Sequence, residues 1–360
     1  MPDASVHDSF AVGIATASPG INSGVSKGLN VAIVGATGAV GQEFLRLFEA
    51  RSFPVASLRL LASERSVGKS YSFKGEEHIV AEAKPEAFKG VDVAFFSAGA
   101  SRSRALAPAA LEAGALVVDN SSAFRMDEDV PLVVPEVNPG TMADKRLLAV
   151  PNCTAIILVT AIHPLRQLGK LDRLIVSTYQ SASGGGAGMM RLLEDETRKV
   201  ICGEEPDPSH LGTRYAFNLF SHNTPINEDG YNEEEAKVIL ETRKILGLPD
   251  LKVNVTCVRV PVLRAHSESV TVEFDGPAPA PEAVREVLSK APGVRLVDDR
   301  TNNRFPTPVD ASGQGDVLVG RIRKDLSNPN ALCLFIAGDQ LLKGAALNAV
   351  QIAEQALNLS

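Results

Sequence analysis

The chain has 360 residues, of which 44% are hydrophobic and 22% are charged, the proportions of an ordinary soluble globular protein. This length favours two domains. The net charge of −7 excludes a general electrostatic footprint for nucleic acid or an anionic membrane, and no apolar run is long enough to span a bilayer. We therefore expect neither of these partners.

The cysteines and the N-terminus bear on location. The four cysteines, at positions 153, 202, 257 and 333, are far apart and form no CxxC pair, which predicts a reduced, cytoplasmic compartment and no metal site. Residues 1–28 are rich in Ser, Ala and Gly and carry Asp3 and Asp8. They fit neither a secretory signal nor a transit peptide, so we predict a disordered extension.

A strand, a glycine turn and a helix follow each other at the start of the predicted fold. Residues 29–34 read as a buried strand, the turn carries Gly35, Gly38 and Gly41, and apolar residues then recur at helical spacing. Glycines let backbone N–H groups approach a pyrophosphate at the helix N-terminus. The spacing is GxxGxxG rather than GxGxxG. The pattern favours a dinucleotide site over the alternative, a tight turn without a ligand.

The second predicted strand, residues 58–61, is followed by Ser63, Glu64, Arg65 and Ser66. Proteins that prefer NAD place an acidic residue here for the ribose hydroxyls. An arginine flanked by hydroxyls instead suits a 2′-phosphate, through charge-assisted hydrogen bonds. The stretch favours NADP over NAD, and the alternative is an exposed polar turn.

Further strands are predicted at residues 91–97, 115–119 and 132–134, with a helix at 105–113 between the first two. This alternation predicts an α/β fold with a parallel sheet covered by helices on both faces. Arg125 should then lie near the carboxyl edge of that sheet, where a cofactor would pass.

Cys153 follows a short strand, residues 147–150, and precedes a helical pattern that runs to about residue 169, with Pro164 kinking or ending it. The first N–H groups of a helix and its dipole favour a thiolate, which is the nucleophilic form of cysteine. The position therefore makes Cys153 a candidate for covalent catalysis, although position alone more often indicates a structural cysteine. The alternative is a buried structural cysteine.

A strand at residues 174–179 leads to Gln180 and to a Ser/Gly-rich run, 181–188, which predicts either close approach to a ligand or a hinge. A helix is predicted at 233–246. Its Glu234, Lys237 and Glu241 have the spacing of a solvated, ion-paired face.

A strand at residues 253–260 places Arg259 on an otherwise apolar face, so that cation needs an anionic partner, either a carboxylate of the protein or a ligand. His266 lies on the next stretch. We assign no role to the other histidines: His7, His78, His163, His210 and His222. A strand at 270–274, a helix at 282–291, a strand from 334 and a last helix at 344–357 complete the chain, and the last helix can pack back on the first domain.

Taken together, these motifs resemble the aspartate-β-semialdehyde dehydrogenase family, over residues 28–357. The matching stretches are 35–41, 119–125, 151–153, 177–180, 234–237, Arg259 through 266–268, and 343–346. Two positions depart from the family pattern. Thr154 stands where the family usually has Ser, and Gln340 stands where many members have Asn.

The resemblance implies a Rossmann-like NADP-binding domain at residues 29–152, completed by 340–360, and an α+β catalytic and dimerisation domain at 153–339. It also implies a homodimer without a metal. The reaction would be the NADPH-dependent reductive dephosphorylation of L-4-aspartyl phosphate to L-aspartate 4-semialdehyde and phosphate, a step toward lysine, diaminopimelate, methionine, threonine and isoleucine.

The resemblance further implies residue roles. Cys153 would form a thioester, His266 would be the acid/base and Gln180 would orient the intermediate. Arg259 would hold the α-carboxylate and Glu234 the α-ammonium. Phosphate would be held by Arg125, Asn152 and Lys237. NADP would contact Gly35, Thr37, Gly38, Ala39, Val40, Ser63, Arg65, Ser66, Ser183, Gly184 and Gln340.

Two other functions compete with this interpretation. N-acetyl-γ-glutamyl-phosphate reductase uses the same chemistry, but its substrate has no ammonium for Glu234 to pair with. A non-catalytic NADP-sensing protein would need the glycine turn and Arg65 but neither Cys153 nor His266.

Overall fold

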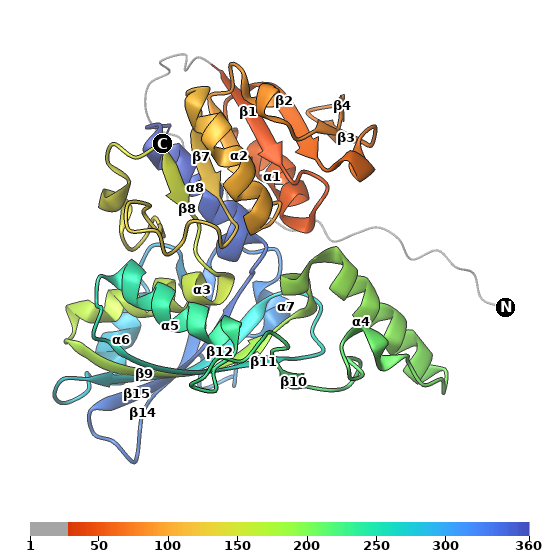
Figure 1. Ribbon diagram of the computed structural model, residues 1–360. Coiled ribbons are helices and arrows are strands. Elements are labelled where there is room, and N and C mark those ends of the chain that lie inside the picture. Colours follow the sequence, from red (N-terminus) through yellow and green to blue (C-terminus); the bar gives the residue numbers. More distant parts are fainter. Residues whose placement is uncertain (1–27, 360) are drawn as a thin grey trace.

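The computed structural model describes residues 28–359, and it is built on two sheets (Figure 1). The predicted N-terminal extension lies outside the described residues apart from Gly28. The first sheet is parallel throughout and has the order β5-β2-β1-β6-β7-β8. Its strands are β1 Leu29–Val34, β2 Val55–Ala62, β5 Ala81–Glu82, β6 Val93–Phe96, β7 Leu116–Asp119 and β8 Leu147–Ala149. Successive strands are added on one side of β1 (β2, then β5) and afterwards on its other side (β6, β7, β8). Because the strand order reverses between β1 and β6, a Rossmann-type crevice opens at their carboxyl ends.

Three helices pack on this sheet: α1 Ala39–Ala50, α2 Ala100–Glu112 and α8 Leu347–Ala356. The last of these contacts α1 and β7, so the prediction that the final helix packs back on the first domain is confirmed. Aromatic rings fill the space between α1 and the sheet, with Phe48 4.9 Å from Phe53 and 5.3 Å from Phe95 between ring centroids. This packing fixes α1, whose N-terminus faces the crevice.

The second sheet is mixed, in the order β10-β11-β9-β12-β15-β14-β13. Its strands are β9 Leu171–Gln180, β10 Phe220–Ser221, β11 Lys252–Arg259, β12 His266–Phe274, β13 Val294–Leu296, β14 Val317–Lys324 and β15 Ala331–Gly338. The helices α3 Cys153–Ile162, α5 Glu233–Leu246 and α6 Pro281–Leu288 cover the face that is turned toward the first sheet (Figure 1). The start of α3 therefore lies between the two sheets.

Several expectations need correction. Residues 132–134 form only an isolated bridge, Leu132 to Ala149, because Pro131 and Pro135 bracket the segment. The helix predicted to about residue 169 ends at Ile162 and continues as a 3-10 turn, His163–Gln167, so Pro164 does end the α-helix. The run 181–188 is not irregular. It forms a 3-10 turn, Ala182–Gly185, and opens α4.

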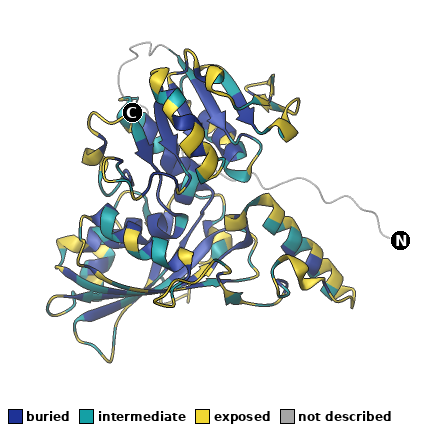
Figure 2. Cartoon of the chain, in the orientation of Figure 1, coloured by how far each residue is buried: buried dark blue, intermediate teal, exposed yellow. Residues whose placement is uncertain are grey.

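The remaining elements are peripheral or short. Helix α4 Gly186–Ile201 extends away from the body, and most of its residues are exposed or half-buried (Figure 2). The others are the hairpin β3 Ser70–Phe73 with β4 Glu76–Ile79, helix α7 Pro308–Ala311, a π-helical turn Leu342–Ala346, and 3-10 turns at Glu64–Ser66, Pro85–Phe88, Pro139–Met142 and Pro208–His210. Within residues 28–359, no helix has both the length and the apolar character needed to cross a membrane.

Candidate active site

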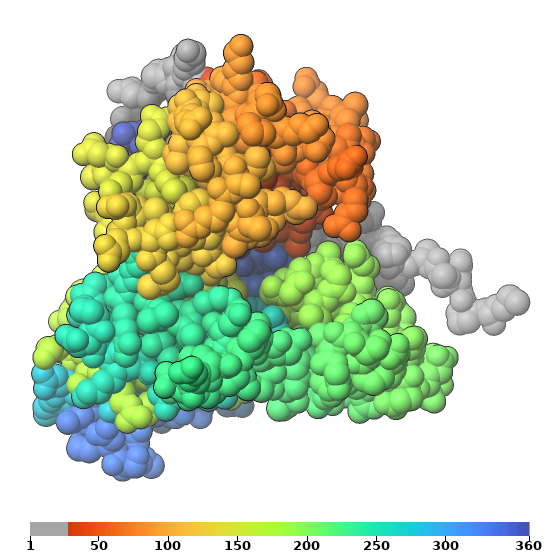
Figure 3. Space-filling view, in the orientation of Figure 1, coloured from red at the N-terminus to blue at the C-terminus, as the bar shows by residue number. Residues whose placement is uncertain are grey.

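A cavity of about 350 Å³ lies between the two sheets, at the N-terminus of α3. Figure 3 shows the corresponding recess between the upper and lower parts of the molecule, with C-terminal residues at its floor. All eight residues predicted to act in catalysis or substrate binding line it: Arg125, Asn152, Cys153, Gln180, Glu234, Lys237, Arg259 and His266. Sequence-distant motifs thus meet in one place.

Cys153 is the first residue of α3, as predicted. Asn152 caps the helix: its Oδ1 accepts hydrogen bonds from Thr154 N and Ala155 N, at 3.0 and 3.3 Å. The backbone N–H of Asn152 donates to Glu241 at 2.5 Å. These bonds satisfy the donors at the start of the helix and fix the backbone that carries the thiol.

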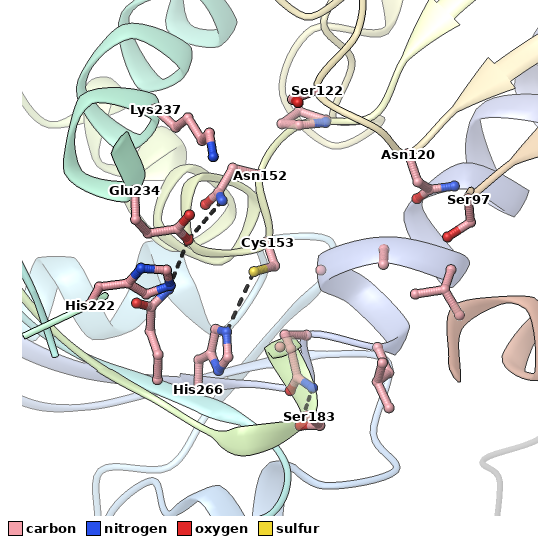
Figure 4. Close-up of a pocket in the computed structure, with 18 of the residues that line it drawn as sticks. Ser97, Asn120, Ser122, Asn152, Cys153, Ser183, His222, Glu234, Lys237 and His266 are labelled. Atoms are coloured by element: carbon pink, nitrogen blue, oxygen red, sulfur yellow. Dashed lines mark hydrogen bonds between the residues drawn. The ribbon is translucent and has the colours of Figure 1, made fainter. Parts of the chain in front are cut away.

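His266 faces Cys153. Its Nε2 lies 3.4 Å from Sγ, and Figure 4 shows the ring directed at the sulfur. The backbone N–H of Ser181 donates to Nδ1 at 3.0 Å, and Ser181 Oγ lies at the same distance. Because Nδ1 accepts from an N–H group, the neutral imidazole carries its hydrogen on Nε2, toward the sulfur. Burial and the neighbouring Arg259 lower the pKa of His266 to about 3, so the ring is neutral at pH 7.

The expectation of a thiolate at the start of α3 is wrong for the resting site. Burial, together with the charge of Glu234, raises the pKa of Cys153 to about 12, against the opposing effects of Arg259, Arg125 and the Thr154 N–H. Desolvation outweighs the helix N-terminus here. The resting pair is therefore a thiol beside a neutral imidazole.

Three of the predicted residues stand in one row across the second sheet. Arg259 on β11 is paired with Gln180 on β9, and the β9–β12 register, in which Tyr179 is paired with Ser267, sets Gln180 beside His266. Residues directly opposite one another in neighbouring strands point to the same face. Strand pairing therefore aligns these side chains below Cys153.

Arg259 is held by two acceptors of the protein. Its Nη1 donates to Ser181 O at 3.0 Å and its Nη2 to His222 Nε2 at 2.8 Å. Its Nε is buried without a hydrogen-bond partner in the described part of the chain, and no carboxylate among residues 28–359 forms an ion pair with it. The anionic partner that this cation was expected to need is therefore left to a ligand.

Glu234 is the acidic group of the cavity. Its Oε1 accepts from Asn152 Nδ2 (Figure 4) and from Gln180 Nε2, each at 2.9 Å. Burial disfavours its ionised form, but His222, these two amides and Lys237 outweigh burial and lower the pKa of Glu234. The site therefore holds a buried carboxylate that is charged at pH 7.

The predicted solvated face of α5 is wrong. Helix 233–246 is confirmed, yet Glu234 is only 7% exposed and Glu241 only 2%, because α5 packs against both α3 and β11. Lys237 pairs with Glu233, at 3.7 Å, rather than with the predicted partners. The helical spacing of these charged residues was predicted correctly, but the helix face that carries Glu234 and Glu241 is buried rather than exposed to solvent.

Arg125 also lines the cavity, but three of its nitrogens are engaged. Nη1 pairs with Glu241 at 3.1 Å, Nε donates to Val150 O and Nη2 to Asn120 O, both at 2.9 Å. Arginine has five N–H donors, so two remain for a ligand. Arg125 thus links the segments before Cys153 to α5 and also faces the cavity.

The glycine turn has the shape of a cradle. A Cβ on Gly35, whose φ is +93°, would lie 2.2 Å from Ser97 O, and one on Gly41 would lie 2.4 Å from Gly35 O. Gly38 caps α1 without any side-chain hydrogen bond, so the first N–H groups of that helix point toward the crevice unscreened by a cap. These residues, with Thr37, Ala39 and Val40, fit a dinucleotide pyrophosphate.

The other predicted cofactor residues fall into two groups. Ser63, Arg65 and Ser66 lie at an exposed or half-exposed turn after β2, next to the glycine turn. Ser183, Gly184 and Gln340 line the main cavity. Gln340 has a structural task as well, since its Oε1 accepts from Ala265 N at 3.0 Å and its Nε2 donates to Ser183 Oγ. It thereby holds the segment that leads into His266.

Sequence reasoning missed three residues of this site. His222 lines the cavity and contacts Arg259, Ser181 contacts both His266 and Arg259, and Glu241 braces Arg125 and Asn152. No local pattern marks His222 or Ser181. Glu241 was seen as a charge at helical spacing, and only the apolar faces on both sides of α5 could have indicated its burial.

The chain matches two family models that together cover most of it. Residues 30–145 match "semialdehyde dehydrogenase, NAD binding domain", and residues 162–343 match "semialdehyde dehydrogenase, dimerisation domain". The two matches correspond to the parallel sheet and to the mixed sheet.

Individual proteins are similar over nearly their whole length. The chain is 53% identical to aspartate-semialdehyde dehydrogenase from Synechocystis, covering 91% of this chain and 96% of that one, and 47% identical to the Bacillus subtilis enzyme of that name, covering 93% and 99%. Among solved structures, aspartate semialdehyde dehydrogenase II from Vibrio cholerae, complexed with ASA, is 42% identical with a TM-score of 0.89, covering 92% of this chain and 99% of that one. The Candida albicans enzyme with NADP is 26% identical with a TM-score of 0.71 and the same coverage.

Proposed function

The chain belongs to the aspartate-semialdehyde dehydrogenase family, and we propose that it converts L-4-aspartyl phosphate and NADPH to L-aspartate 4-semialdehyde, phosphate and NADP. This step leads toward lysine, diaminopimelate, methionine, threonine and isoleucine. The observation that carries the proposal is the distance of 3.4 Å between Cys153 Sγ and His266 Nε2. The same cavity is lined by the charged residues Arg259 and Glu234.

The cradle fits NADP. The turn from Gly35 to Val40 would hold the pyrophosphate, while Ser63, Arg65 and Ser66 would hold the 2′-phosphate through charge-assisted hydrogen bonds. Ser183, Gly184 and Gln340 line the cavity beside Cys153 and would hold the nicotinamide end. When bound, the nicotinamide supplies the hydride that reduces the acyl group.

Cys153 would act as the nucleophile. Its Sγ attacks the acyl carbon, the C–O bond to phosphate breaks, and phosphate leaves with the bonding electrons, so a thioester remains. The resting ring carries its hydrogen on Nε2, so His266 can take the thiol proton there only after that hydrogen has moved to Nδ1. Ser181 Oγ, 3.0 Å from Nδ1, would then accept it in place of the bond that Ser181 N–H donates to Nδ1 in the resting site. Nε2 would later exchange a proton with the thiohemiacetal oxygen on Cys153, whose collapse breaks the C–S bond and frees the aldehyde.

The charges of the cavity match the two ends of an aspartyl group. Arg259 would grip the α-carboxylate with its remaining N–H donors, and the ionised Glu234 would pair with the α-ammonium. Gln180, whose Oε1 has no partner within residues 28–359, would orient the intermediate. Arg125, Asn152 and Lys237 also line the cavity and would hold the phosphate.

We propose the same organisation for the whole protein as for the family. Residues 29–152 with 340–360 would form the NADP-binding domain, and 153–339 the catalytic and dimerisation domain of a homodimer. The match of 162–343 to a dimerisation domain supports the latter. The four free cysteines support a cytoplasmic location, where thiols stay reduced.

The two competing functions are not favoured. The relatives named above carry the name aspartate-semialdehyde dehydrogenase, and a buried anionic Glu234 suits a free ammonium rather than an N-acetyl group. A protein that only senses NADP has no need for a thiol paired with an imidazole.

The test has two parts. Phosphate-dependent NADP reduction should be fast with L-aspartate 4-semialdehyde and slow with N-acetylglutamate semialdehyde. Incubating the enzyme with L-4-aspartyl phosphate, without NADPH, should add one aspartyl mass to the peptide that contains Cys153, and Cys153→Ala should abolish both turnover and the added mass while NADP still binds. Turnover by that variant near the wild-type rate would refute the covalent mechanism.

A further inference from the structure

We propose that His222 is a positioning residue for substrate recognition: it fixes the guanidinium of Arg259 in the orientation that grips a carboxylate. The inference rests on the proposed function, in which Arg259 binds the α-carboxylate of the substrate. It assigns a role in specificity to a histidine that the sequence left without one.

Strand pairing places His222 beside Arg259. Strand β10 pairs antiparallel with β11, with Phe220 opposite Arg259 and Ser221 opposite Val258. The pairing extends one residue further, because His222 N donates to Cys257 O at 2.9 Å. His222 is therefore the diagonal neighbour of Arg259 on the same face of the sheet, within reach for a long side chain.

The contact has a defined polarity. Arginine only donates, so Nε2 of His222 must be the acceptor of the 2.8 Å bond from Arg259 Nη2. The hydrogen of the neutral ring then stands on Nδ1, which lies 3.4 Å from Thr224 Oγ1. Burial and the adjacent Arg259 lower the pKa of His222 to about 4, so the ring stays a neutral acceptor at pH 7.

Two acceptors fix the guanidinium plane. Ser181 O engages Nη1 and His222 Nε2 engages Nη2, so each of these nitrogens keeps one further hydrogen for a ligand. A carboxylate needs two parallel N–H donors in one plane. Without His222, the bond to Ser181 alone would let the plane rotate, and binding of the substrate carboxylate would have to restore the orientation.

The test compares His222→Leu with His222→Gln. Leucine removes the acceptor, whereas the Oε1 of glutamine can still accept from Arg259. In phosphate-dependent NADP reduction, we expect leucine to raise the KM for L-aspartate 4-semialdehyde about tenfold, as for a lost hydrogen bond to a charged group, and glutamine to keep it within about threefold of wild type. The KM values for phosphate and NADP, and kcat, should change less than about twofold.

A matched control and a double variant separate this role from general damage. His163→Leu removes a half-buried imidazole that lies outside the cavity, and it should leave all three KM values unchanged. In the double variant His222→Leu with Arg259→Leu, the KM for the semialdehyde should equal that of Arg259→Leu alone, because His222 acts through Arg259. Thermal melting checks folding, and His222→Met replaces the leucine variant if the latter does not fold.

The outcomes distinguish the two levels of the proposal. An unchanged KM for the semialdehyde in Arg259→Leu would overturn the proposed role of Arg259 itself. If Arg259→Leu raises that KM but His222→Leu does not, or if the two effects add, the proposed role of His222 is wrong. Equal increases in all three KM values in His222→Leu would likewise assign His222 a purely structural role.

Discussion

Gly344 abuts the nucleophile: a Cβ added at this position would lie 2.9 Å from the Cβ of Cys153 and 3.2 Å from that of Gln340. Real Cβ atoms essentially never come closer than 3.0 Å. Gly344 belongs to the π-helical turn Leu342–Ala346, which packs against the start of α3. The π-helical turn therefore packs directly against Cys153, and only a glycine at position 344 leaves room for the Cys153 side chain.

We expect Gly344→Ala to displace Cys153 and to lower kcat by about 10- to 100-fold, since a shift of less than 1 Å at a reacting atom has effects of this size. Stability should fall by about 1–3 kcal/mol through overpacking. Steady-state kinetics and urea unfolding measure the two effects.

Gly188 provides the matched control, because it is also helical and a Cβ there would meet nothing within 4 Å. Gly188→Ala should keep kcat and raise stability by up to about 1 kcal/mol. Equal kinetics for the two alanine variants would mean that the contact between Gly344 and Cys153 does not position the thiol.

A second prediction concerns the choice of cofactor. Arg65 lies exposed in the 3-10 turn Glu64–Ser66 after β2. Arg65→Ala should lower kcat/KM for NADPH by about 10- to 100-fold and leave kcat/KM for NADH nearly unchanged. A loss of this size is expected when a charge-assisted hydrogen bond to the 2′-phosphate is removed. Lys69→Ala, a nearby exposed cation after that turn, is the control. Equal losses with both nucleotides would argue against a contact with the 2′-phosphate.

A third prediction concerns Glu241, which accepts from Arg125 at 3.1 Å and from the backbone N–H of Asn152 at 2.5 Å. Glu241→Leu leaves a buried cation and a buried donor unpaired, so the free energy of unfolding should fall by about 3–5 kcal/mol. Glu241→Gln keeps an acceptor and should lose less. Denaturant unfolding of both variants at one protein concentration tests this. Equal losses of unfolding free energy in Glu241→Leu and Glu241→Gln would show that a hydrogen-bond acceptor at position 241 is unimportant.

The parts of the fold that local patterns determine were predictable. The strand, glycine turn and helix from Leu29 to Ala50 each follow from a short periodic stretch, as does α5, which begins at a capping box of Asn232 and Glu235. Cys153 was recognisable because a proline and an asparagine separate a strand from a helix there. In each case neighbours in sequence carry the information.

The parts that depend on distant contacts were not predictable. His222 follows a strand of two residues, and its contact with Arg259 arises from pairing with β11, which lies more than thirty residues further along the chain. Strand β14 was missed because its alternation is broken by a bulge: Arg321 has a φ of +54°, and a Cβ on Gly320 would lie 2.0 Å from Val297 O. The raised pKa of Cys153 likewise depends on burial by segments far away in the chain.

A last prediction concerns Glu268, which lies on β12 opposite Thr178, two residues along the same face from His266. It is fully buried, neither carboxyl oxygen has a partner within residues 28–359, and burial raises its pKa well above 4.5. The unfolded chain therefore loses this proton at a lower pH than the folded chain, so the contribution of Glu268 is most favourable below pH 4.5 and is lost as pH rises toward its folded-state pKa. Relative to Glu268→Gln, which does not titrate, the wild type should lose up to about 1.4 kcal/mol per pH unit across that window. Urea unfolding of both proteins at several pH values and one protein concentration measures the difference, and a difference that does not change with pH would show that Glu268 is ionised in the folded state as readily as in the unfolded chain.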